Sequence, residues 1–306
     1  MHIIELKSNR LFYHDNWSVC LNIERLKTLP QYLLPQHSIT RLIGHYADEA
    51  MGPKTTKAIK WFVDRYKVNM NEAANPDIAS YKTFNEFFTR PLKEGIRPIC
   101  GEGFLASPVD GAVSQAGRIR QHFLIQAKNH DYTNVDLLAG DKTLASKFDD
   151  GNFATIYLAP KDYHRIHMPI DGKLVGMKHV PGKLFSVNPI TARNVPNLFA
   201  RNERVICLFE TEVGLMAQIL VGATIVGSME TVWHGTVKGD KGHKVSTFRY
   251  QGNDAITLKK GDEMGRFKLG STVILLFEKN AISLNAKMQP DTDLKYGQMI
   301  ATIHNR

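Results

Sequence analysis

Apolar residues recur at helical spacing in the first third of the chain. The positions three or four residues apart fall into two sets: Ile39, Leu42, Ile43 and Tyr46, then Ile59, Phe62, Val63 and Tyr66. This spacing predicts two amphipathic helices. Gly52 and Pro53 lie between the sets, which is typical of one helix ending and the next beginning. A third helix is predicted from Thr83, because Glu86 completes a capping box, and Pro91 ends it.

Beyond about residue 98 the pattern becomes that of strands. Apolar runs at 153–158, 204–210 and 214–229 are separated by Gly, Pro and Asn, and the run TVILLF at 272–277 predicts a buried strand. The sequence therefore predicts an α+β fold with a helical N-terminal part and a β-rich body. The predicted parts are an extension of unknown role at 1–26, a helical region at 27–97 and the β-rich body at 98–306.

Composition narrows the class of protein. The 306 residues are 43% hydrophobic and 23% charged, which is ordinary for a globular chain, and the net charge of +9 favours an anionic partner. Nucleic acid is disfavoured because the basic residues are not interleaved with aromatics on a recognisable binding fold. Three cysteines without metal-like spacing favour a reducing compartment.

Neither a signal peptide nor a membrane span is expected. The chain starts with polar and charged residues where a signal peptide would have an apolar core. The most apolar stretch, 217–229, is shorter than the roughly 20 residues that span a bilayer.

Gly270 and Ser271 precede the last apolar strand and allow two interpretations. The pair is either a common turn into a strand or a nucleophile beside an accessible carbonyl, and a nucleophile needs a base with an orienting group. His164 and His167 are candidate bases, although they also fit an exposed turn or half of a metal site. Asp110 is the candidate orienting carboxylate, although an Asp in such a turn commonly bonds its own backbone.

Five motifs then occur in a fixed order: SPVDG, DYHRIHMP, PGKLFSVN, VGATIVGS and FKLGST. On these motifs the chain resembles the bacterial, membrane-associated phosphatidylserine decarboxylases, from about Leu29 to the C-terminus. Val109 stands where the family turn has alanine.

The resemblance implies chemistry for each candidate. Asp110, His167 and Ser271 would form a self-cleavage triad that cuts between Gly270 and Ser271, giving a large chain 1–270 and a small chain 271–306. Ser271 would become a covalent pyruvoyl cofactor that forms a Schiff base with the substrate amine, with no metal or pyridoxal. His164 would donate the proton in decarboxylation, for which a pKa near neutrality is expected.

The resemblance also implies a substrate and a cellular location. Phosphatidylserine would be converted to phosphatidylethanolamine and carbon dioxide in phospholipid biosynthesis, with Phe185 and Ser186 lining the substrate pocket. The chain would be peripheral on the cytoplasmic face of the membrane, as a homodimer of processed heterodimers. Lys54, Lys57 and Lys60 beside Trp61 suit an anionic surface, unless these helices merely pack on the body.

Two alternatives stay open. A soluble pyruvoyl-dependent amino-acid decarboxylase would share the cofactor chemistry. A lipid-binding β module, in which the Gly-Ser pair is only a turn, would leave the chain uncleaved.

Overall fold

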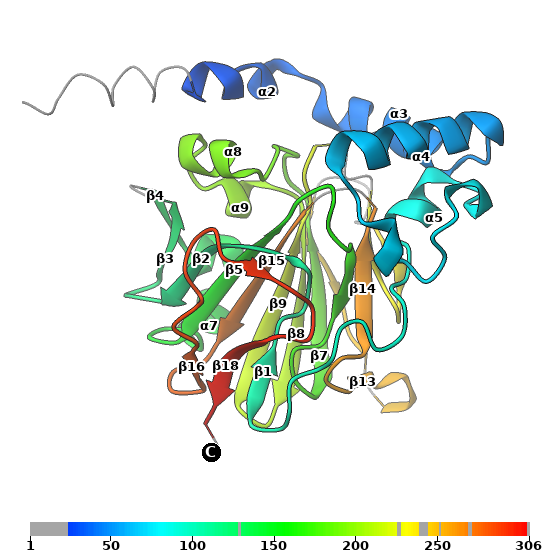
Figure 1. Cartoon of the computed structure of the whole chain (residues 1–306). Coiled ribbons are helices and arrows are strands. Elements are labelled where there is room, and N and C mark those ends of the chain that lie inside the picture. Colours follow the sequence, from blue (N-terminus) through cyan, green and yellow to red (C-terminus); the bar gives the residue numbers. More distant parts are fainter. Residues whose placement is uncertain are drawn as a thin grey trace, which may run out of the picture.

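The computed structural model describes residues 24–127, 130–224, 228–238, 244–250, 252–268 and 271–304. Helices lie along one end of a strand-rich body (Figure 1). The predicted α+β class is confirmed. Most of the predicted extension, together with Leu269 and Gly270, falls outside the described residues.

The three predicted helices are present. They are α3 (Gln36–Asp48), α4 (Pro53–Tyr66) and α5 (Phe84–Phe88); the short helix α2 (Pro30–Leu33) precedes them, and 3-10 turns lie at Met70–Glu72 and Ile78–Ser80. Gly52 has φ of 57° before α4, a conformation that suits glycine. Thr83 caps α5 by accepting a hydrogen bond from the Glu86 N–H at 3.0 Å, as the capping box predicts.

The helices differ in what their apolar side chains contact. Ile59 and Phe62 of α4 are buried with Phe87 and Phe88 in a small second core. Leu42 of α3, in contrast, is 57% exposed. Packing within this second core therefore accounts for the buried apolar side chains of α4, but no such packing covers the whole apolar stripe of α3. Among the described residues, no helix is long and apolar enough to cross a membrane.

The core of the body is a large antiparallel sheet. Its strand order is β12 (Ser246–Phe248), β7 (Gly172–Val180), β8 (Arg204–Thr211), β9 (Gly214–Val221), β15 (Ser271–Phe277), β5 (Asn152–Leu158), β2 (Gly111–Arg118) and β17 (Asp293–Leu294), and β13 (Thr257–Leu258) also pairs with β7. Every residue of β15 is buried, which explains its unbroken apolar run.

Smaller sheets and helices complete the body. One sheet has the order β11 (Gly235–Val237), β10 (Met229–Thr231), β14 (Glu263–Phe267) and β6 (Arg165–His167); others are β1 (Phe104–Ala106) with β18 (Met299–Ile303) and β16 (Ile282–Leu284), and β3 (Phe123–Ala127) with β4 (His130–Thr133). Short helices are α6 (Asn134–Leu137), α7 (Lys142–Ser146), α8 (Pro189–Asn194) and α9 (Leu198–Arg201), with a 3-10 turn at Gly252–Asp254. Strands β15, β17 and β18 each pair with strands from earlier in the chain, so the C-terminal segment is built into two sheets.

Candidate active site at one edge of the large sheet

The candidate residues come together where three neighbouring strands of the large sheet, β15, β5 and β2, begin or end. This row of strand ends is the edge of the sheet referred to below. Ser271 begins β15 and pairs with Leu158, the last residue of β5. Asp110 immediately precedes β2, the strand on the other side of β5. The N–H of His167 donates to the carbonyl of Pro108 at 2.9 Å, which ties the histidine segment to the Asp110 turn.

Ser271 is fully buried, and its hydroxyl has no hydrogen-bond partner among the described residues. Leaving a buried polar group unpaired costs about 1–3 kcal/mol. Native proteins seldom keep such groups without a reason. An unpaired hydroxyl beside the predicted scissile bond is free to act as a nucleophile.

His164 is also fully buried, and its ring stacks on Phe88 with centroids 4.1 Å apart. Its Nε2 lies 3.1 Å from the Ala159 carbonyl, while Nδ1 has no partner in the described part of the chain. Burial, with help from the charge of Arg90, lowers its pKa to about 3. His164 is therefore neutral at pH 7 in the uncleaved chain, which differs from the near-neutral pKa expected from its proposed role.

His167 has partners at both ring nitrogens. Nδ1 lies 2.8 Å from the carbonyl of Gly261, and Nε2 lies 3.0 Å from the Tyr163 hydroxyl. A carbonyl can only accept, so Nδ1 carries the proton and Nε2 accepts from Tyr163. Burial lowers the pKa of His167 and raises that of Tyr163, which favours this neutral pair. The Nε2 lone pair is thus in the tautomer that a general base requires.

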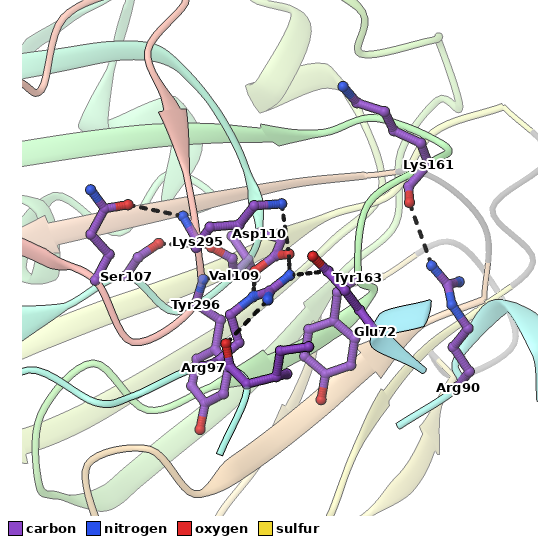
Figure 2. Close-up of polar contacts among 12 residues, drawn as sticks. Glu72, Arg90, Arg97, Ser107, Val109, Asp110, Lys161, Tyr163, Lys295 and Tyr296 are labelled. Carbon is purple, nitrogen blue, oxygen red and sulfur yellow. Dashed lines mark hydrogen bonds and ion pairs between the residues drawn. The ribbon is translucent and has the colours of Figure 1, made fainter. Parts of the chain in front are cut away.

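Asp110 lies in a network of cations (Figure 2). Its carboxylate accepts from Arg97 at 2.6 and 3.1 Å, from Lys295 at 3.2 Å and from the Tyr296 N–H at 2.8 Å. Arg97 also pairs with Glu72. Burial alone would raise the pKa of Asp110, but the bonds from Arg97 and Tyr296 and the charge of Lys295 outweigh it and hold this pKa below its ordinary value.

The candidates share an edge but are not joined as a hydrogen-bonded triad. Within the described residues, no hydrogen bond links Asp110 to His167 or His167 to Ser271. The group that orients His167 in this structure is the Gly261 carbonyl.

Phe185 and Ser186 contact the short N-terminal helix α2. The Phe185 ring is 4.9 Å from both the Tyr32 ring and the Arg201 guanidinium carbon. The N–H of Ser186 donates to Gln31 at 2.9 Å. Phe185 borders a cavity of about 270 Å³ that is distinct from the cavity beside Asp110.

Several polar residues of the site were not predicted from the sequence: Arg97, Tyr163, Lys295 and Tyr296. Tyr163 lies inside the DYHRIHMP motif, so its proximity to the histidines was a usable signal. Lys295 contacts Asp110 across 185 positions of sequence. Spacing along the chain gives no sign of such a contact.

Known proteins resemble this chain over most of its length. The family model described as phosphatidylserine decarboxylase matches residues 84–302, and a second, described as PSD, matches residues 26–67. A phosphatidylserine decarboxylase proenzyme of Dechloromonas aromatica is 56% identical over 282 residues, covering 92% of this chain and 99% of the relative. Proenzymes of the same name from Vibrio vulnificus and Shewanella halifaxensis are 57% and 54% identical, covering 87% and 92% of this chain and 94% and 100% of the relatives.

These matches define the class of protein, an enzyme family whose curated relatives are proenzymes. The chain belongs to the phosphatidylserine decarboxylase family.

Proposed function

We propose that this chain is a self-processing, pyruvoyl-dependent decarboxylase that converts phosphatidylserine to phosphatidylethanolamine and carbon dioxide. Family membership supports the substrate and the reaction. The observation that carries the self-processing is the buried hydroxyl of Ser271 at the start of β15, which has no partner in the described part of the chain.

Self-cleavage would begin when the Ser271 hydroxyl oxygen attacks the Gly270 carbonyl carbon. The hydroxyl proton passes to a base and then to the departing amide nitrogen, leaving an ester and a free amine. Elimination across Cα–Cβ releases the large chain as a carboxylate, and the dehydroalanine left behind takes up water and loses ammonia. The new N-terminal group of the small chain is a pyruvoyl group.

His167 is proposed as the base, because its Nε2 lone pair is available once Tyr163 gives way to Ser271. The charge of Asp110 raises the pKa of His167 and so favours its protonated form. The Arg97, Lys295 and Tyr296 contacts keep Asp110 ionised for this purpose. Among the described residues, Asp110 therefore influences His167 through its negative charge and not through a direct hydrogen bond to the imidazole.

The surroundings of Ser271 fit a pyruvoyl group. The residue is fully buried, and within the described residues its hydroxyl has no hydrogen bond to lose when it is consumed. A pyruvoyl group supplies an electron sink for decarboxylation. His164, whose Nδ1 has no partner among the described residues, is proposed to take up a proton at Nδ1 and to deliver it to the carbon that loses the carboxylate.

Cleavage would leave the two chains associated. The small chain keeps β15 paired between β9 and β5, and its Lys295 and Tyr296 remain bonded to Asp110 of the large chain. A dimer of such processed units belongs to the same proposal and follows from the family resemblance.

The N-terminal helices are proposed to lie on the anionic cytoplasmic surface of a membrane. They expose large apolar side chains: Leu26, Leu29, Tyr32, Leu33, Leu34, Leu42, Tyr46 and Trp61. Between α3 and the segment before the scissile bond is a cavity of about 510 Å³, lined in part by Arg41, Leu184 and Lys268. A headgroup could pass from the surface to the site through this cavity, with Phe185 and Ser186 nearby.

The test is carbon dioxide release from phosphatidylserine vesicles by purified, processed protein, with phosphatidylethanolamine measured as product. Ser271→Ala is the matched control and should release none. Free serine tests the soluble amino-acid decarboxylase alternative. Release from free serine but not from the lipid would overturn the proposed substrate.

A further inference from the structure

Arg90 is a buried cation whose hydrogen-bonding capacity is largely unused. It follows α5 in the chain and is 3% exposed. Its Nε and Nη1 have no hydrogen-bond partner among the described residues, and Nη2 lies 3.4 Å from the Lys161 carbonyl, a long contact (Figure 2). The guanidinium carbon lies 5.3 Å from the centre of the Phe87 ring. A ring face attracts the charge but leaves the N–H donors unsatisfied.

Arg204 shows what a buried structural arginine looks like in the same molecule. It is 2% exposed, and all three of its nitrogens donate to backbone carbonyls, including those of Leu137 at 2.7 Å, Ala200 at 2.6 Å and Asp136 at 2.7 Å. Such a network holds the fold together. Arg90 lacks one, and unpaired buried donors are costly, so packing alone does not account for it.

The unused donors border a cavity. Arg90 lines a space of about 240 Å³ together with Asp110, Gly111, Asp162 and Tyr163. Gly111 begins β2, and β5 separates β2 from β15, so this cavity lies about two strand spacings, or about 10 Å, from Ser271 along the sheet edge. A lipid headgroup attached near Ser271 could therefore reach it.

The charges around the cavity favour an anionic occupant. The Asp110 and Glu72 carboxylates that line it are already paired with Arg97 and Lys295. Burial raises the pKa of Asp162, which weakens its competition for the guanidinium. Arg90, which stays protonated, is left without an ion-pair partner among the described residues.

We propose that Arg90 binds an oxyanion of the phosphoserine headgroup, either its carboxylate or its phosphodiester, in the cavity beside Asp110. This rests on the proposed function and adds a binding residue to it. A guanidinium donates two parallel hydrogen bonds to either oxyanion. Burial is the main cause of the low pKa of His164 and the charge of Arg90 adds to it, so a bound anion would remove the second contribution where His164 must supply a proton.

The test measures binding without chemistry. In the uncleaved Ser271→Ala chain, titration calorimetry with glycerophosphoserine should give a dissociation constant that Arg90→Met raises roughly tenfold or more, because charge-assisted hydrogen bonds are lost. Arg90→Lys keeps the charge but cannot donate two parallel hydrogen bonds, so it should give an intermediate dissociation constant. It replaces the Met variant in the test if that variant does not fold. Equal affinity in the parent chain and in the folded Arg90 variants would overturn the inference.

Glycerophosphoethanolamine, which lacks the carboxylate, distinguishes the two oxyanions. Weakened binding of glycerophosphoserine alone identifies the carboxylate, and weakened binding of both ligands identifies the phosphodiester. Arg204→Lys should change the melting temperature but not either affinity.

Turnover separates this inference from the proposed function. If the wild-type protein is inactive on phosphatidylserine, the proposed function fails. If it is active and Arg90→Lys, once processed, has an unchanged KM, only the role of Arg90 fails.

Discussion

At the edge of the large sheet the chain buries polar atoms without partners, whereas the N-terminal helices expose large apolar side chains. Ser271 and His164 represent the first region, since both are fully buried and each has a polar atom without a partner among the residues that the structure describes. Leu33 represents the second, at 88% exposed. The two regions break the ordinary rule of burial in opposite directions.

The comparison teaches that the two departures serve different partners. An unpaired buried hydroxyl is costly until it reacts, and an exposed leucine is costly until an apolar phase covers it. Under the proposed function, the sheet edge is completed by the cleavage reaction and the helices by a lipid surface. Changes in one region should leave the function of the other intact.

The largest expected effect is at Ser271. Ser271→Ala should abolish self-cleavage and decarboxylation, because no hydroxyl remains to attack Gly270. Thr272→Val is a matched control, since the Thr272 hydroxyl is also buried without a partner in the described part of the chain. It should still cleave on a denaturing gel. A cleaved Ser271→Ala chain would refute the assignment of the nucleophile.

The two histidines should separate cleavage from turnover. His167→Ala and Asp110→Ala should stay uncleaved, because the base or the charge that supports it is lost. His164→Ala should cleave and trap phosphatidylserine reducibly with borohydride, yet decarboxylate slowly. Gels and borohydride trapping on the same samples check this. The reverse pattern would exchange the two roles, and processing and turnover by both histidine variants would remove both residues from the mechanism.

A third effect should appear at the helices only. Leu33→Ser should weaken binding to phosphatidylserine vesicles, measured by sedimentation, roughly ten- to hundredfold, since burying a leucine side chain in an apolar phase contributes about 1.5–3 kcal/mol. Self-cleavage should be unchanged. Val232→Ser is the control, because Val232 is 49% exposed but lies on the β body. Equal vesicle binding by the Leu33 variant and the wild type would assign Leu33 to an ordinary solvent-exposed position.

The smallest effect is expected at Tyr163. Its hydroxyl occupies the Nε2 lone pair that His167 needs as a base. Tyr163→Phe removes that competitor, and one hydrogen bond contributes about 0.5–1.5 kcal/mol, so cleavage should become roughly two- to tenfold faster. A time course of freshly refolded chain measures this. Slower cleavage would show that Tyr163 assists His167.

The sequence predicted the elements better than the site. Periodicity located α3, α4 and the strand β15, because each is governed by local spacing and burial. It could not predict that Lys295 would contact Asp110, since strand pairing decides which distant segments meet. The order of the motifs identified His164 and His167 as candidates. It did not identify Tyr163 and Gly261 as the hydrogen-bond partners of His167, because these contacts depend on side-chain packing.

The central claim is that Ser271 becomes the reactive group of a small chain. Intact mass spectrometry of purified active protein tests it most directly. Two masses are predicted, for residues 1–270 and for a small chain of residues 271–306 that is lighter by one ammonia than a serine-started peptide. A single full-length mass in active protein would contradict the claim.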